Sequence, residues 1–369
     1  MIEIAAYALH EANGPLTPFR LQRRDPGVND IVVDILYCGI CHSDLLSAHD
    51  GLKRSIFPMV PGHEIVGRVA RVGSGVSKHR VGELVGIGCI IDSCRTCAPC
   101  REHDEHYCVE RFTSSFNGRE RGTGNPTYGG YSQTYVIDEN YAVKIPAGLD
   151  PAAAAPLLCG GITTYRPLKL FFETKRFETK RFETRGFETK SGARKSLRVG
   201  VVGLGGLGHL AIKFAKAFGA DPVMLTSSPN KVGDAQKLGA VDVILTSDAA
   251  QMTKAMGSLD FILDTVSAPH DPNAYMNLLK RGATMCLVGM PEQPLVVQPM
   301  SLVWGDKALS GSLIGGIQAT QEMLDFCAEH GIAADIEMIA IQDVNDAWAR
   351  MERNEVKYRF VIDMATLKG

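Results

Sequence analysis

Cysteine and histidine residues in the first half of this sequence have the types and spacing of zinc ligands. Cys41 lies in the segment CGICHSD, and His63 lies in PGHE. Thiolate and neutral imidazole are preferred zinc ligands, and a catalytic zinc takes three protein ligands and keeps one position open. Asp44 is the kind of carboxylate that orients a ligating histidine. Cys41 and His63 can be two of these ligands, and the third must come from elsewhere. Taken singly, the two residues also fit a buried small side chain and a histidine in a turn.

A second group consists of four cysteines close together, Cys94, Cys97, Cys100 and Cys108. The C-x2-C-x2-C-x7-C spacing can close the tetrahedral all-thiolate site of a structural zinc. Disulfides are the alternative, but neighbours three positions apart rarely reach disulfide geometry, and crowded cysteines favour a reducing compartment. We therefore predict a structural zinc that pins a surface lobe, with His103 and His106 exposed in its loop.

A glycine-rich segment marks a third chemical site. A run of valines after Arg198 leads into GLGGLG, and apolar residues at helical spacing follow over 210–218. A strand, a glycine turn and a helix form the context in which G-x-G-x-x-G binds a dinucleotide, because a pyrophosphate can approach backbone N–H groups at the helix N-terminus. A plain tight turn is the alternative. The predicted cofactor contacts here are Gly203, Leu204, Gly205, Gly206, Leu207 and Gly208.

The end of the next predicted strand favours NADP(H) over NAD. An NAD site has an acidic residue about 20 positions after the glycines, which accepts a hydrogen bond from the ribose. Here no acid occurs between Pro222 and Gly233. The segment instead offers hydroxyls and one cation, which suit a 2′-phosphate: Thr226, Ser227, Ser228 and Lys231.

The elements that must carry these motifs fall into two domains, as expected for 369 residues. Short strands with Gly- and Pro-rich turns predict a β-rich domain at the N-terminus. After Arg198, strands at 222–226, 242–246, 259–266 and 284–289 alternate with helices, which predicts an α/β fold with a doubly wound parallel sheet. Cys159 lies where the β-rich part ends. A third zinc ligand there would place the metal in the cleft between the domains, facing the cofactor.

Composition excludes several function classes. The formal net charge is −2, so no general attraction to nucleic acid or to an anionic membrane is expected. No apolar run reaches the length of a bilayer span, and residues 1–14 lack the pattern of a secretory signal. We expect a cytoplasmic protein with a small-molecule substrate and neither a membrane nor a nucleic-acid partner.

Residues 171–195 contain a five-residue tandem repeat, FETKR-FETKR-FETRG-FETK. A period of five matches neither a helix nor a strand. We interpret the segment as a low-complexity insertion exposed on the surface between the domains. A basic and aromatic strip for a nucleic acid or a protein partner is the alternative, but the glutamates cancel most of the positive charge.

Together these motifs resemble the zinc-dependent medium-chain dehydrogenase/reductases, and most closely their cinnamyl alcohol dehydrogenase and NADPH-dependent aldehyde reductase branch. The resemblance extends from near the N-terminus to the end and leaves out only the repeat. The matching segments are GICHSD (39–44), PGHE (61–64), the four-cysteine lobe (94–108), LLCGGITTY (157–165), GVVGLGGLGH (200–209), DTV (264–266), LVG (287–289), GSLIGG (311–316) and KYRFVID (357–363).

The resemblance implies a set of site residues and a domain division. Catalytic zinc would be held by Cys41, His63 and Cys159, with Glu64 adjacent and able to exchange into the coordination sphere, and Ser43 would bond the substrate oxygen. Further cofactor contacts would be Ser43, Thr163, Thr265, Gly289, Ser312, Leu313, Ile314 and Arg359. Residues 1–159 and 316–369 would form a GroES-like catalytic domain and residues 160–315 a Rossmann domain. The protein would be a homodimer with two zinc ions per subunit, paired near 309–314.

The expected activity is hydride transfer between NADP(H) and primary alcohols or aldehydes, aromatic (cinnamyl or benzyl) or aliphatic. An NAD-preferring alcohol dehydrogenase of the same family and a non-enzymatic zinc- and NADP-binding interaction protein stay open as alternatives. One residue departs from the family pattern. A histidine of the proton relay is replaced by Leu46, so His42 or water would have to carry the proton.

Overall fold

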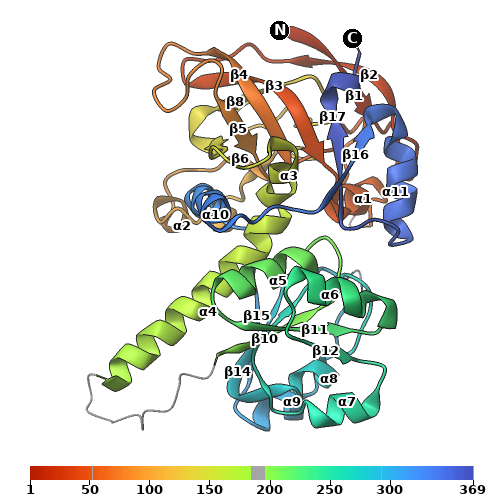
Figure 1. Cartoon of the computed structure of the whole chain (residues 1–369). Helices are drawn as coiled ribbons and strands as arrows, with labels where there is room; N and C mark the ends of the chain where they lie inside the picture. The colour runs from red at the N-terminus through yellow and green to blue at the C-terminus, as the bar shows by residue number, and fades with distance from the viewer. Residues whose placement is uncertain (52, 184–195, 292, 369) are drawn as a thin grey trace. The chain divides into compact units, whose positions relative to one another are not determined.

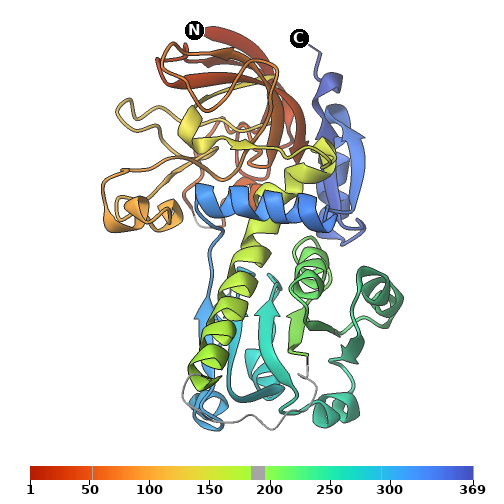
Figure 2. The same cartoon turned by 60° about the vertical axis from the view of Figure 1, so that its left-hand side comes forward.

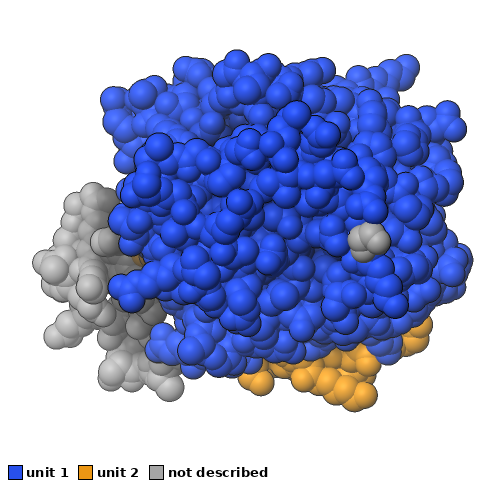
Figure 3. Space-filling view, turned by 90° about the horizontal axis from the view of Figure 1, so that it is seen from above, with its two compact units in different colours: residues 1–162, 314–369 blue, residues 163–313 orange. Residues whose placement is uncertain are grey.

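The structure is a computed structural model, which describes residues 1–51, 53–183, 196–291 and 293–368. Internal contacts divide the chain into two compact units, which Figure 3 colours separately. Unit 1 comprises Met1–Ile162 and Ile314–Gly369, and unit 2 comprises Thr163–Leu313. The domain boundaries expected at 159–160 and 315–316 lie close to these limits and stay a prediction.

Unit 1 is rich in β-structure, as predicted (Figure 1). Its main sheet has the order β16-β17-β3-β4-β5-β9, with β8 paired to β3, and the pairs are antiparallel except for β16 with β17. β1 pairs with β2 and β6 pairs with β7 in two smaller sheets. The strands are β1 (Ile2–Ala8), β2 (Thr17–Arg23), β3 (Asp30–Gly39), β4 (Ile65–Val72), β5 (Leu84–Ile87), β6 (Ile90–Asp92), β7 (Thr113–Ser114), β8 (Thr134–Asp138), β9 (Val143–Lys144), β16 (Ile336–Ala340) and β17 (Arg359–Asp363).

Helices connect these strands, and several candidate metal ligands lie next to their ends. They are α1 (His42–Ala48), α2 (Ala98–Arg101), α3 (Pro151–Ala154), α10 (Ile317–His330) and α11 (Val344–Glu352), with 3-10 turns η1 (Glu105–Tyr107), η2 (Glu139–Tyr141), η3 (Ala155–Leu158), η5 (Ile341–Asp343) and η6 (Met364–Thr366). β3 and β4 run antiparallel, with Cys38 opposite Ile65. The end of β3 and the start of β4 are therefore neighbours, which brings the CGICHSD and PGHE segments together.

Unit 2 contains a parallel sheet in the order β12-β11-β10-β13-β14-β15, seen from a second side in Figure 2. The order runs outward in both directions from β10, so the predicted doubly wound sheet is confirmed. Apolar side chains such as Val223, Leu225 and Ile262 fill its core. The elements are β10 (Arg198–Val202), β11 (Asp221–Thr226), β12 (Asp242–Leu245), β13 (Leu259–Asp264), β14 (Leu279–Leu287) and β15 (Ala308–Gly311), with α5 (Gly208–Ala217), η4 (Pro229–Lys231), α6 (Val232–Leu238), α7 (Ala249–Lys254), α8 (Pro272–Met276) and α9 (Pro299–Val303).

Helix α4 (Gly160–Glu183) corrects the prediction of a wholly exposed repeat. The helix runs through the first repeats, and Phe172 is buried, with its ring stacked on Phe218 at 5.2 Å between centroids. The preceding Phe171 stacks on Phe261 at 4.6 Å. The insertion thus begins as a packed helix, because Phe171 and Phe172 lie on the side of the helix that faces the core of unit 2. Residues 184–195 of the repeat lie outside the described residues. In the described part of the chain, no helix is long and apolar enough to cross a membrane.

Candidate metal centres and nucleotide site

Four buried side chains of unit 1 converge on one point. One ligand atom from each of Cys41, His63, Glu64 and Cys159 lies within 4.8 Å of the others. Cys41 follows β3 and precedes α1, while His63 and Glu64 directly precede β4. Cys159 directly follows η3. Two thiols, an imidazole and a carboxylate form the donor set of a zinc site.

Asp44 organises this cluster from the first turn of α1. Its fully buried carboxylate accepts hydrogen bonds from the backbone N–H of Cys41 at 2.9 Å and of Gly62 at 3.1 Å. It also bonds Nδ1 of His63 at 3.1 Å. A carboxylate accepts, so Nδ1 carries the proton and Nε2 keeps a lone pair for a metal. Phe116 stacks on the same imidazole, with 5.5 Å between ring centroids.

The second ring nitrogen of His63 tests whether the residues fit a metal. Nε2 is buried and has no hydrogen-bond partner among the described residues. A buried polar atom without a partner is costly unless something binds it. This atom lies among the thiols of the cluster, so zinc fits the position.

The two thiols of the cluster interact directly. The Sγ atoms of Cys41 and Cys159 are 3.9 Å apart, and either can donate to the other. The hydrogen bond from Cys159, and then the nearby His63, hold the pKa of Cys41 well below its usual range. A thiolate at Cys41 is the form that binds a metal.

Glu64 is held by a residue from the C-terminal strand β17. Arg359 donates from Nη2 to both carboxylate oxygens of Glu64 at 2.6 Å and to the carbonyl of Ile40 at 2.8 Å. Both charged side chains are buried. A Cβ on Gly39 would collide with the Glu64 carboxylate, which explains a glycine there. Arg359 is thus the ion-pair partner of Glu64. Its expected contact with the cofactor stays a prediction.

The four cysteines of the lobe also converge. The Sγ atoms of Cys94, Cys97, Cys100 and Cys108 lie within 4.8 Å of one another, and none of the ten cysteines forms a disulfide. The guanidinium of Arg121 lies 3.8 Å from the Cys108 sulfur, where it offsets thiolate charge. Sequence spacing found the thiols but gave no signal for Arg121.

The two histidines of this lobe differ in exposure. His103 is exposed as predicted, but His106 is buried, so that prediction was wrong. Its ring packs at 4.0 Å from the ring of Tyr107, which removes it from solvent.

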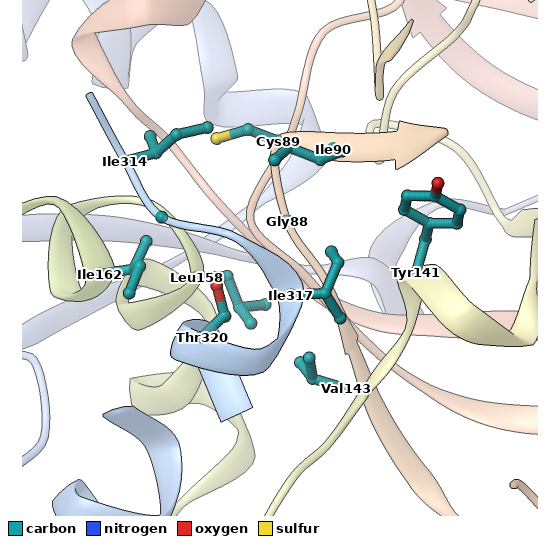
Figure 4. A pocket seen from close by; sticks show the side chains of 11 residues that line it. Gly88, Cys89, Ile90, Tyr141, Val143, Leu158, Ile162, Ile314, Ile317 and Thr320 are labelled. Carbon is teal, nitrogen blue, oxygen red and sulfur yellow. The ribbon is translucent and has the colours of Figure 1, made fainter. Parts of the chain in front are cut away.

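Cys89 is a site residue that sequence analysis missed. It lines a small cavity whose other walls include Leu158, Ile162 and Ile314, as Figure 4 shows. A hydrogen bond with Cys159 lowers the pKa of its thiol. The segment Gly88–Cys89 reaches this place because β5 delivers it against η3, where a Cβ on Gly88 would touch the Leu158 carbonyl at 3.0 Å. No local spacing pattern includes Cys89.

In unit 2, the glycine turn has the geometry of a phosphate cradle. Gly203 adopts φ +87°, a conformation that favours glycine. A Cβ on Gly205 would meet open space, so its backbone can approach a ligand, and a Cβ on Gly208 would collide with the Gly203 carbonyl. These are the three roles of the glycines in a dinucleotide motif: turn, ligand approach and helix–strand packing.

Neighbouring strand ends surround this turn. Thr265, which follows β13, donates to the carbonyls of Val202 at 2.7 Å and Gly203 at 3.3 Å. Gly289 follows β14 and packs on the backbone of Val266. Its nitrogen donates to the Asp264 carbonyl at 3.0 Å.

The predicted phosphate-binding segment also reaches the turn. Lys231 donates from Nζ to the Leu204 carbonyl at 3.0 Å, and burial lowers the pKa of this lysine. Thr226 is buried, and its hydroxyl accepts from the Ser228 nitrogen at 3.2 Å, whereas Ser227 is exposed.

The other predicted cofactor residues are divided between the units. Thr163 lies buried in α4, and Ser312 and Leu313 follow β15, all in unit 2. Ser43, Ile314 and Arg359 belong to unit 1. Their shared contact with a cofactor stays a prediction.

Comparison with known proteins gives full-length matches. Residues 27–147 match the alcohol dehydrogenase GroES-like domain, and residues 206–329 match the zinc-binding dehydrogenase family. Aldehyde reductase YahK of Escherichia coli K12 is 46% identical over 368 residues, which cover 99% of each chain.

Two solved structures are similar over their whole length. A cinnamyl alcohol dehydrogenase of Sorghum bicolor (SbCAD4) is 40% identical, with a TM-score of 0.90 over 100% of this chain and 99% of that chain. The CAD of Helicobacter pylori, solved with NADP(H), is 35% identical, with a TM-score of 0.88 and the same coverage. These matches confirm the resemblance and the fold class. The chain belongs to the zinc-binding dehydrogenases with an alcohol dehydrogenase GroES-like domain.

Proposed function

We propose that this protein is a zinc-dependent, NADP(H)-linked alcohol dehydrogenase that reduces aldehydes and oxidises primary alcohols. The observation that carries the proposal is the orphaned Nε2 of His63. It is buried near two thiols while Asp44 holds the opposite nitrogen. The nearby thiols distinguish it from other buried atoms without a hydrogen-bond partner, such as Nδ1 of His79, which belongs to neither candidate metal cluster of the described residues.

The site divides its tasks among residues of unit 1. Cys41, His63 and Cys159 hold the catalytic zinc, with Glu64 beside them. When bound, zinc supplies Lewis-acid chemistry: it polarises the substrate oxygen and lowers the pKa of the alcohol. Ser43 is exposed, and its hydroxyl lies 3.7 Å from the Cys41 sulfur, so it can take the proton of the alcohol and pass it on. Leu46 cannot accept a proton, so the route leaves through exposed His42 or through water.

Residues of unit 2 hold NADP(H), which gives or takes the hydride. The pyrophosphate binds at Gly205 and the N-terminus of α5, where the backbone is open. Ser227 and Lys231 bind the 2′-phosphate, since Lys231 already lies against the glycine turn and no acid follows β11. The four-cysteine lobe holds the second zinc, which has only a structural role.

A homodimer is the assembly we propose. β15 is the edge strand of its sheet, and a free edge invites pairing with a second copy. Val296, Met300, Val303 and Trp304 expose large apolar surfaces near it in sequence. We place the protein in the cytoplasm, because its many free thiols suit a reducing compartment. Light scattering of the purified protein tests the dimer, and a monomer at working concentration would overturn it.

The activity is tested by reduction of cinnamaldehyde, benzaldehyde and a straight-chain aldehyde with NADPH and with NADH. The expected result is zinc-dependent reduction with a clear preference for NADPH. A preference for NADH would overturn the assignment of Lys231. Binding of zinc and NADPH without reduction of any aldehyde would favour the non-enzymatic alternative.

A further inference from the structure

A buried carboxylate and a histidine lie behind the nucleotide turn. Asp264 ends β13 and is 1% exposed, and His270 lies in the connection to α8. Nε2 of His270 is 2.7 Å from Oδ2 of Asp264, and Nδ1 is 2.9 Å from the carbonyl oxygen of Ala268. Both ring nitrogens are therefore engaged, and the imidazole ties the connection to the end of β13.

The connection between β13 and α8, residues 265–271, directly supports the glycine turn at 203–208. Oδ1 of Asp264 accepts from the Val266 nitrogen at 3.0 Å, and Val266 fills the space that a Cβ on Gly203 would need. The adjacent Thr265 holds the carbonyls of Val202 and Gly203. A shift of Val266 or Thr265 would move the turn on which the pyrophosphate is proposed to bind.

The hydrogen bonds of His270 determine how many protons the pair holds. A carbonyl oxygen only accepts, so Nδ1 must carry a hydrogen toward Ala268. Nε2 can then bond Asp264 in two ways: a charged ring donates to the carboxylate, or a protonated acid donates to a neutral ring. Each arrangement holds one proton more than a neutral histidine beside a carboxylate. Burial raises the pKa of the Asp264 carboxyl, which favours retention of this proton.

We propose that His270 is a positioning residue for the nucleotide turn, and that the proton it shares with Asp264 strengthens NADP(H) binding. The proposal rests on the proposed NADP(H) site. When rising pH removes the shared proton, one of the two hydrogen bonds of the ring must be lost, so the connection loosens and cofactor affinity falls. Titratable groups described near the pair include Tyr275, at 5.8 Å from His270 between ring centroids, Asp271 at the start of α8, and Cys286 of β14, which interacts electrostatically with Asp264. Burial raises the pKa of Tyr275, so it stays neutral. Burial also raises the pKa of Cys286.

NADPH binding to the zinc-loaded protein tests this, measured by cofactor fluorescence at about pH 6 and about pH 9. We expect wild-type affinity to fall about tenfold at the higher pH, the order of one charge-assisted hydrogen bond. His270→Ala should bind NADPH about tenfold more weakly than the wild type at about pH 6 and lose little more at about pH 9. In steady-state assays it should raise the KM for NADPH and leave kcat at saturating NADPH nearly unchanged.

Asp264→Asn separates positioning from general stability. Its amide can keep the bond from the Val266 nitrogen and donate to a neutral Nε2 with no shared proton. We expect wild-type affinity at low pH and no loss at high pH. His10→Ala, an exposed histidine of unit 1, is the control for the change of residue type.

Three outcomes are decisive. If the wild type does not bind NADPH, the proposed function fails. If the wild type binds NADPH but His270→Ala binds equally well, the present inference fails alone. If Asp264→Asn keeps the pH dependence of the wild type, the shared proton is refuted even when His270→Ala does not fold.

Discussion

Replacing Asp44 with asparagine exchanges one carboxylate oxygen for an NH2 group beside the candidate zinc ligands. The carboxylate accepts hydrogen bonds from Cys41, Gly62 and His63, two of them at Oδ1 and one at Oδ2. An asparagine has one acceptor oxygen. If that oxygen stays toward His63, the amide N–H groups face the donating N–H of Cys41, and that bond is lost.

The magnitude follows from these contacts. Loss of one buried hydrogen bond to a charged acceptor costs about 1.5–3 kcal/mol, and the two remaining bonds weaken because the acceptor is neutral. We expect the free energy of unfolding to fall by about 2–3 kcal/mol. A residue that orients a metal-ligating histidine typically contributes about 10- to 100-fold to metal affinity, so zinc affinity should fall by that factor.

The assay is the zinc content of the folded protein after dialysis against graded chelator concentrations, together with thermal unfolding. Asp34→Asn is a matched control, because Asp34 is exposed on β3 of the same unit. Aldehyde reduction should decline in proportion to the zinc lost. If Asp44→Asn keeps zinc at the same chelator concentration as the wild type, Asp44 does not orient His63 and the reasoning is wrong.

The remaining predictions concern the lobe, the cofactor and the repeat. Backbone N–H groups of Cys97 and Thr96 lower the pKa of Cys94 to about 6, whereas burial raises that of Cys100 to about 12, so zinc must displace protons from the lobe and its uptake should weaken steadily as the pH falls, measured by metal titration of the apoprotein. Lys231→Ala should raise the KM for NADPH about tenfold and leave the KM for NADH unchanged; equal effects on both would contradict a phosphate contact. Phe172→Ala should cost about 3–5 kcal/mol in denaturant unfolding, whereas the exposed Leu170→Ala should cost far less.

Local spacing was enough to predict some parts of the site. The four cysteines of the lobe and the glycines of the turn are close in sequence, and the structure brings each group together. Cys41 and His63 meet only because β3 pairs with β4, and a β-rich pattern alone does not give that register. Cys159 was predicted from its place at the end of the β-rich part and from the family resemblance, since no local spacing links it to Cys41 and His63.

Other features depend on tertiary packing and left no local pattern. Cys89 reaches its position through contact with distant segments around Leu158 and Ile314. Arg121 and His270 contact residues nearer in sequence, Cys108 and Asp264, but no recognisable motif marks either of them. The repeat was misjudged because its period was considered without the helix before it. α4 carries Phe172 into the core regardless of the five-residue period.

The ion pair between Glu64 and Arg359 has a consequence for synthesis of the protein. Glu64 is buried beside the thiols, and its counter-charge comes from β17, near the end of the chain. β17 also pairs with the edge of β3 from which Cys41 emerges. Until β17 has been made, the Glu64 carboxylate has no counter-charge, and a buried carboxylate without a partner is strongly destabilising unless it takes up a proton. The proposed catalytic zinc site therefore gets its charged carboxylate only after translation has reached β17, although the candidate ligands are made much earlier.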